Sequence, residues 1–167
     1  LKHTPTVTMD GVAVDLMANV EMPDDAGLAL DSGAVGIGLF RSEFLFMNRK
    51  GKMPDEDEQF GAYRQTVEAM KGLPVTIRTI DIGADKPLDV DEDGRSAYLS
   101  PLGLRAIRWS LSEPDMFLIQ IRAILRASIF GQMKILIPML AHAQEIDQTL
   151  ALIETAKKQL EDQGVLF

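Results

Sequence analysis

Residues 35–47 read Val-Gly-Ile-Gly-Leu-Phe-Arg-Ser-Glu-Phe-Leu-Phe-Met. The first six residues, Val35 to Phe40, form a short apolar run that predicts a buried strand. This strand is expected to stop at Arg41, with Glu43 two positions further along the chain. A permanently charged guanidinium at the end of a buried strand is costly unless an anion meets it. That anion is Glu43, a neighbouring carboxylate or a bound phosphate, and the stretch by itself leaves the three open.

The quoted strand belongs to a repeating order of short apolar segments and helix-type segments. Each predicted strand is apolar on both faces, which is typical of a parallel sheet covered by helices. Four such units make half of a (β/α)₈ TIM barrel, and a small doubly wound α/β sheet is the alternative that the pattern leaves open. The expected strands are 12–20, 35–40, 74–80 and 133–139, and the expected helices are 26–30, 56–71, 103–111, 116–128 and 143–162.

The composition argues against several classes of function. The formal net charge of −8 and the pI of about 4.7 give no electrostatic support for nucleic-acid binding. The chain has no cysteine, so it holds no disulfide, thiolate metal site or cysteine nucleophile. No apolar run approaches the ~18 residues of a membrane span, and no signal-peptide pattern opens the chain. We therefore expect a cytoplasmic protein without membrane insertion.

The two ends of the chain suggest a piece of a longer protein, because it begins at Leu1 rather than Met and stops abruptly at Phe167. Residues 1–11 are polar and rich in Thr, and are expected to be a leader or linker. Residues 12–167 are then expected to form one partial barrel domain.

Polar residues gather after the predicted strands, at the ends that form the site-bearing face of a parallel α/β fold. Arg41 follows one strand, Arg78 lies near the end of the next, and Asp81 and Lys86 come just after it. Two arginines on one face are suited to bidentate contacts with a phosphate or carboxylate. The alternative is structural: Arg41 pairs with Glu43, and Arg78 pairs with Asp81.

Two further pairs of arginines lie at helical spacing. Arg105 and Arg108 are three residues apart and border a long Gly-rich loop, so they are candidates for a ligand site as well as for surface. Arg122 and Arg126 are four residues apart on the next helix and are expected to be solvated or ion-paired. The acidic run 55–58 is expected to be the exposed start of a helix rather than a metal site.

Four segments resemble the enzyme I family, the phosphoenolpyruvate–protein phosphotransferases of the bacterial sugar phosphotransferase system. They are 36–49, 77–86, 103–108 and 120–128. The resemblance implies a TIM barrel of the phosphoenolpyruvate-utilising type, here about four βα units, which binds phosphoenolpyruvate with Mg²⁺ at its carboxyl-end face. In the family, the phosphoryl group passes to a histidine of the protein's own N-terminal domain and then to the carrier HPr for sugar uptake. The family also implies a homodimer.

The resemblance assigns residues one by one. Arg41 and Arg78 fall on the family's phosphoenolpyruvate-binding arginines, and Arg105 falls on a further arginine near the same site. Such guanidinium groups suit phosphoryl transfer because they neutralise charge that spreads over the phosphate oxygens. Residues with a lesser expected role around these arginines are Asp81, Lys86 and Arg108.

The chain departs from the family pattern at Ser42, Ala84 and Ser100, where the family usually has Thr, Gly and Asn. These departures leave open a multi-domain or nitrogen-related paralogue. The family's metal-binding Glu and Asp and its active-site Cys are expected beyond residue 167. We therefore expect no catalytic residue and no metal ligand within this chain, and no turnover by the chain alone. The alternatives are part of a pyruvate phosphate dikinase or phosphoenolpyruvate synthase, and a non-catalytic regulatory barrel module.

Overall fold

The computed structural model describes residues 2, 4–47, 49, 52–82 and 103–167. Its centre is a sheet of four parallel strands whose order in space is their order along the chain. A doubly wound sheet reverses this order at a switch point, whereas a barrel adds each strand beside the preceding one. No reversal occurs among the described strands, so the fold is α/β of the partial-barrel kind. The strands are β1 (Ala18–Val20), β2 (Ile37–Arg41), β3 (Val75–Arg78) and β4 (Met133–Leu136).

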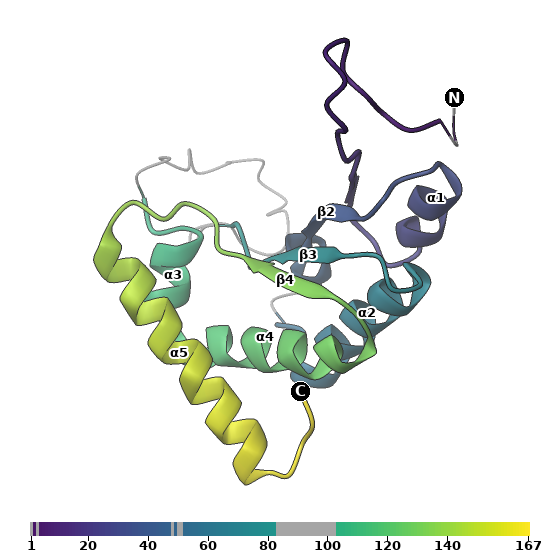
Figure 1. The fold of residues 1–167 in the computed structure, drawn as a ribbon. Helices are drawn as coiled ribbons and strands as arrows, with labels where there is room; N and C mark the ends of the chain where they lie inside the picture. The colour runs from purple at the N-terminus through teal and green to yellow at the C-terminus, as the bar shows by residue number, and fades with distance from the viewer. Residues whose placement is uncertain (1, 3, 48, 50–51, 83–102) are drawn as a thin grey trace, which may run out of the picture.

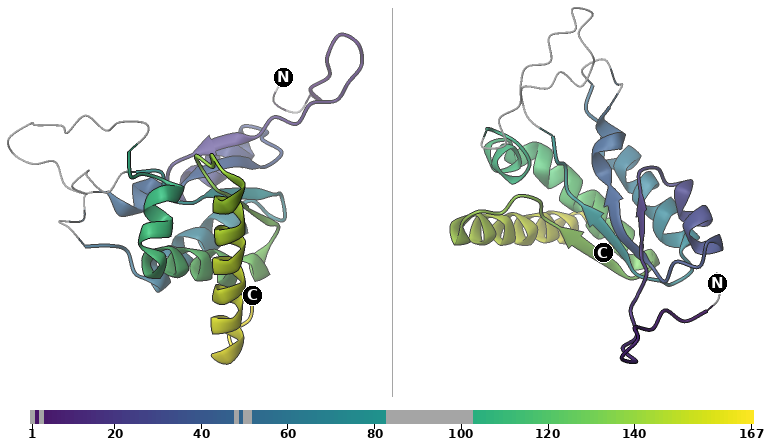
Figure 2. Two further views of the ribbon diagram at one scale, coloured as in Figure 1. Left: turned by 90° about the vertical axis from the view of Figure 1, so that its left-hand side faces the viewer. Right: turned by 90° about the horizontal axis from the view of Figure 1, so that it is seen from above.

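Helices connect the strands and cover one face of the sheet. Figures 1 and 2 show α2, α4 and α5 together beneath the strands, and α2 packs on α4 as α4 packs on α5. On β4, Met133 and Ile135 pack toward the core, while Lys134 between them is exposed and faces the other side. The helices are α1 (Asp25–Asp31), α2 (Glu56–Ala69), α3 (Ile107–Ser112), α4 (Pro114–Ala127) and α5 (Ala143–Asp162), with short 3₁₀ helices η1 (Ser42–Phe46) and η2 (Ser128–Phe130).

None of the helices in the described ranges is long and apolar enough to cross a membrane.

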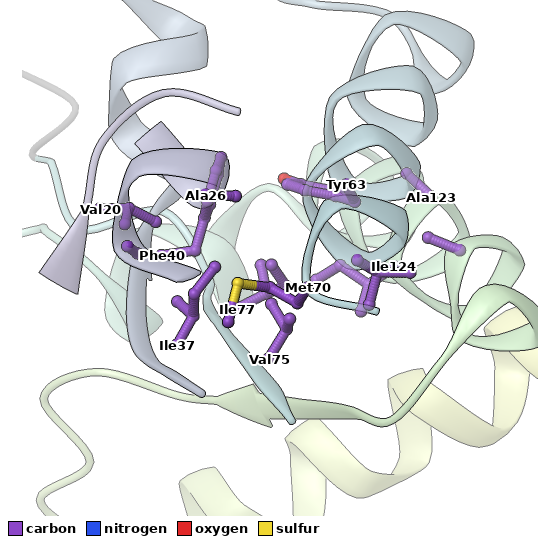
Figure 3. Packing of buried hydrophobic residues seen from close by; sticks show 13 residues of the cluster. Val20, Ala26, Ile37, Phe40, Tyr63, Met70, Val75, Ile77, Ala123 and Ile124 are labelled. Carbon is purple, nitrogen blue, oxygen red and sulfur yellow. The ribbon is translucent and has the colours of Figure 1, made fainter. Parts of the chain in front are cut away.

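The main core lies between the sheet and the helices α2 and α4 (Figure 3). The rings of Phe40 on β2 and Tyr63 on α2 meet edge to face, with centroids 5.9 Å apart, an arrangement that adds to the gain from burying both rings. This shared core therefore fixes the position of α2 relative to the sheet. The other labelled members of this cluster are Val20, Ala26, Ile37, Met70, Val75, Ile77, Ala123 and Ile124.

The acidic run 55–58 begins α2, as the sequence predicts. The side chain of Asp55 accepts a hydrogen bond from the Glu58 backbone N–H at 2.8 Å, and the side chain of Glu58 accepts one from the Asp55 backbone N–H at 2.9 Å. This reciprocal capping box satisfies two donors that a helix start leaves open. Asp55 and Glu58 therefore serve to start the helix.

The arginine pair on α4 is ion-paired, which confirms that expectation. Arg122 Nε lies 2.6 Å from one carboxylate oxygen of Glu56, and Arg126 Nη1 lies 2.8 Å from the other. Glu56 is the first residue of α2, so one carboxylate ties two neighbouring helices of the covering layer together.

The predicted first strand, 12–20, is too long at its start. Only Ala18–Val20 forms β1, and Val12 and Leu16 are each 57% exposed. The neighbouring strand β2 begins at Ile37, opposite Ala18. Further upstream, the carbonyl oxygen of Leu16 accepts one hydrogen bond from the Val35 N–H, and Ala13 forms an isolated antiparallel bridge with Val7 instead of a longer ladder. This segment instead leads away from the sheet (Figure 1). The expected boundary between a leader and a domain near residue 11 remains a prediction.

The predicted helix at 103–111 begins four residues later than expected, at Ile107. Ala106 has φ +48° and ψ −129°, a conformation that no helix contains. The chain therefore turns at Ala106 before α3 starts. The last helix, expected at 143–162, is α5 with those same limits.

Candidate functional site

The carboxyl ends of β2 and β3 lie side by side and carry the two arginines singled out in the sequence. Arg41 is the last residue of β2 and Arg78 the last of β3, and the two are partners in the register of the sheet. Because both strands point the same way, the two guanidinium groups arise from one edge of the sheet. A two-arginine anion site requires both side chains to start from the same edge of the sheet, and Arg41 and Arg78 do so.

A buried carboxylate joins these two arginines. The chain turns into η1 directly after Arg41, which brings Glu43 back toward the strand ends with only 6% of its side chain exposed. Its Oε1 accepts from Arg41 Nε at 3.0 Å and also from Arg78 Nη2. The structural pairing of Arg41 with Glu43 is therefore present, and Glu43 serves Arg78 as well.

Acids and arginines continue to alternate beyond Arg78 and beyond Arg41. Asp81 Oδ2 lies 3.0 Å from Arg78 Nη1, and its Oδ1 lies 3.2 Å from Arg105 Nη2. At the other end, Arg41 Nη1 donates to Glu21, the residue that follows β1. We call these six side chains the arginine row: Glu21, Arg41, Glu43, Arg78, Asp81 and Arg105.

Three cations and three carboxylates balance in formal charge, yet the row leaves some polar atoms without partners. Within the described part of the chain, Glu43 Oε2, Arg78 Nε and Arg105 Nε are buried and make no hydrogen bond. A buried donor or acceptor without a partner costs free energy. The arginine row therefore keeps two N–H donors, one on Arg78 and one on Arg105, that no described group uses.

An apolar cluster packs against the segments that carry the arginine row. Trp109, the only tryptophan of the chain, packs with Phe46 of η1 and with Ile80 and Ile82, which flank Asp81. One face of α3 thus contacts both segments that carry the arginine row. The ring of Phe44 also lies under the Arg41 guanidinium, 4.8 Å from its carbon.

The structure describes one of the two remaining sequence candidates, Arg108. Lys86 falls outside the described residues. Arg108 donates through Nη1 to the carbonyl oxygen of Gly103 at 2.8 Å. The pKa of Glu145 is lowered by hydrogen bonds from the backbone N–H groups of Ala141 and His142, and to a lesser degree by the charge of Arg108. Arg108 therefore also acts toward the start of α5.

Sequence reasoning missed two residues that the structure brings to this edge of the sheet. Glu21 follows β1, in a position comparable with that of Arg41 at the end of β2, so its place after a strand was a usable signal. Gln120 is a polar residue within an otherwise apolar helix face and is only 1% exposed. A buried amide in that setting needs hydrogen-bond partners, and those partners flank the arginine row.

The described residues do not fit a Mg²⁺ site. Among them, no group of three or more His, Cys, Asp or Glu side chains is arranged to hold a metal ion. The row's own carboxylates are each engaged with arginine, which leaves few oxygens for a hard cation.

Comparison with known proteins gives a consistent match. The family model described as "PEP-utilising enzyme, PEP-binding domain" matches residues 1–167. The chain is 69% identical to a phosphoenolpyruvate-protein phosphotransferase of Cupriavidus necator over its whole length. It is 49% identical over 99% of its length to that of Geobacillus stearothermophilus and 46% identical over its whole length to that of Haemophilus influenzae. The chain spans 28–29% of the length of these relatives.

Proposed function

The chain belongs to the PEP-utilising enzymes, as part of their PEP-binding domain, and from that premise we propose that its arginine row binds the phosphate group of phosphoenolpyruvate. The observation that carries the proposal is the register pairing of Arg41 with Arg78 at the carboxyl edge of the sheet. Arg105 joins them through Asp81. Sites of parallel α/β folds are built at this edge.

The acids of the row give the arginines fixed directions. A guanidinium has five N–H donors in a rigid fork, so one or two ion pairs orient it without using all of its donors. Arg78 donates through Nη2 to Glu43, and its Nη1 lies within ion-pair distance of Asp81, while its buried Nε has no partner among the described residues. The proposed phosphate accepts from such remaining donors, or takes the place of a carboxylate.

The chemistry of phosphoryl transfer favours this assignment. Charge spreads over the equatorial oxygens of the phosphoryl group in the transition state, and pre-oriented cations stabilise it. Arg78 and Arg105 have only 18% and 25% of their side chains exposed. Their interaction with an anion is therefore less screened than at an open surface.

For the longer protein, we propose the activity by which its relatives are named. The phosphoryl group would pass from phosphoenolpyruvate to a histidine of the same protein and then to an HPr-type carrier, in a homodimer. The Mg²⁺ ligands would lie outside this chain. The row would supply substrate binding only, because the described side chains on it are arginines and acids held in pairs.

The proposal is tested in a full-length enzyme in which this chain replaces the matched segment of the relative that is 69% identical. Replacing Arg41 or Arg78 with Ala should lower kcat/KM for phosphoenolpyruvate by about 100-fold, since each change removes a charge-assisted contact. Arg78→Lys should recover only part of this loss because Lys lacks the fork. The matched control is Arg64→Ala, which removes an exposed arginine paired with Glu68 on α2.

Circular dichroism and Tm establish that each variant is folded. The proposal fails if folded Arg41→Ala and Arg78→Ala enzymes keep the KM of the parent, or if Arg64→Ala changes KM as much as they do.

A further inference from the structure

A buried side chain of α4 reaches both segments that carry the arginine row. The Oε1 of Gln120 accepts a hydrogen bond from the backbone N–H of Ile80 at 3.0 Å, and its Nε2 donates to the Ser42 hydroxyl at 3.0 Å. Ser42 lies between Arg41 and Glu43 in the sequence. Ile80 lies immediately before Asp81 and two residues after Arg78.

The orientation of this amide is fixed by its partners. A backbone N–H is only a donor, so the amide oxygen must face Ile80. The nitrogen then faces two hydroxyls, that of Ser42 and that of Tyr63, which lies 3.1 Å away. Gln120 therefore uses its acceptor and both of its donors, at a side chain that is 1% exposed.

The third partner anchors the amide to a second helix. Tyr63 is fully buried on α2, and this burial raises the pKa of its phenol, so the hydroxyl stays neutral and keeps its proton to donate. It donates that proton to Oε1 of Gln59 at 3.2 Å. Gln59 in turn donates to the carbonyl oxygen of Pro54 at 3.1 Å.

We propose that Gln120 is a positioning residue for substrate binding, which holds the segment after β2, with Glu43, and the segment after β3, with Asp81, at one spacing. It thereby fixes the carboxylates that orient the guanidinium groups of Arg41 and Arg78, whose strands are already paired in the sheet. The inference rests on the proposed function of the arginine row. Neither segment is fixed to the other by the β ladder beyond Arg41 and Arg78, the last paired residues. The amide continues the connection where the ladder stops.

The test compares two buried glutamines in the full-length enzyme described above. Gln120→Met keeps the length of the side chain but removes its three hydrogen bonds, and should raise KM for phosphoenolpyruvate about tenfold because small displacements of binding groups weaken binding steeply. Gln59→Met removes bonds of the same kind at a position equally buried. It should lower Tm as Gln120→Met does, yet leave KM within about twofold of the parent, since the hydrogen bonds of Gln59 go to Pro54 and Tyr63 and not to the two arginine-bearing segments.

Ser42 provides an independent measurement should Gln120→Met fail to fold. Ser42→Ala removes the acceptor and should raise KM, whereas Ser42→Thr retains a hydroxyl and should restore it. In a folded Gln120→Met background, Ser42→Ala should add little, because the shared bond is already gone.

Two failures are distinguishable. Unchanged KM in Arg78→Ala overturns the proposed function of the arginine row. The positioning role alone is overturned when KM is raised in Arg78→Ala but either of two comparisons shows no difference. The first compares KM of Gln120→Met with that of Gln59→Met, and the second compares KM of Ser42→Ala with that of the parent.

Discussion

At the scale of single residues, Glu43 connects Arg41 and Arg78 of the arginine row. It is the least exposed acid of the arginine row, and its Oε1 contacts both Arg41 and Arg78. Buried charges are tolerated when they are paired. Glu43 thus holds the two guanidinium groups together.

Replacing Glu43 with Gln should destabilise the folded chain. The change leaves two arginines without their shared carboxylate, and breaking a buried ion pair on one side costs about 3 kcal/mol. The measurement is the free energy of unfolding from urea denaturation of the chain. Glu68→Gln is the control, because Glu68 pairs with Arg64 at the surface, where such a pair is worth less than about 1 kcal/mol. Equal effects of the two changes would contradict the role of Glu43.

The sequence allowed three of the row's arginines to be chosen, but not the contacts between them. Arg41 and Arg78 follow apolar runs, and a charged residue at a strand end is visible without coordinates. Which acid serves which arginine depends on register, and Glu43 serving both Arg41 and Arg78 follows from the pairing of β2 with β3. The ion pairs of these arginines are compatible with the proposed binding of an anion, because an ion pair orients a guanidinium without using all its donors.

At the scale of elements, local chemistry made some boundaries predictable and tertiary pairing decided others. The start of α2 follows from its own acids, and α5 has the limits expected from its periodicity. The segment 12–17 has the apolar residues of a strand, but its backbone makes an isolated antiparallel bridge to Val7 instead of extending β1, and α3 starts late because of the backbone at Ala106. Neither of these two causes can be predicted from the residue types or from the hydrophobic periodicity of the sequence.

The start of α5 gives a pH-dependent prediction. Hydrogen bonds from the backbone N–H groups of Ala141 and His142 lower the pKa of Glu145 below its usual 4.5. A lowered folded-state pKa contributes stability that is present above the unfolded pKa and is lost as the pH falls through the folded value. Glu145→Gln should therefore lower Tm by a few degrees at pH 7.

This difference in Tm from the parent should shrink as the pH falls below about 4.5, where the parent also loses the charge. Thermal unfolding from pH 3 to pH 7 measures it. Glu154→Gln is the control, since Glu154 lies on the same helix and pairs with Lys157 at the surface. A difference for Glu145→Gln that stays constant across this range would contradict the capping role.

At the scale of the whole molecule, the order of the strands separated the two folds that the sequence left open. Both contain four βα units, and apolar runs look alike in each. Only the spatial order β1-β2-β3-β4 distinguishes a barrel segment from a doubly wound sheet. The described helices α2, α4 and α5 share one face, as they would on the outside of a barrel (Figures 1 and 2).

The same architecture predicts that the chain does not turn over by itself. It spans 28–29% of the length of the relatives that are named for the activity. We expect no transfer of labelled phosphate from phosphoenolpyruvate to HPr when the folded chain is the sole enzyme. The chimeric full-length enzyme is the positive control. Phosphorylated HPr above background with the chain alone would overturn this prediction.

The sequential order of the sheet also bears on how the protein is made. Each strand pairs with the one synthesised before it, so every unit leaving the ribosome finds its partner edge already formed. Arg41 at the end of β2 and Glu43 just after it would await only β3 and the turn of α4 that carries Gln120. A growing chain can thus assemble from its beginning toward its end, without reopening what has already folded.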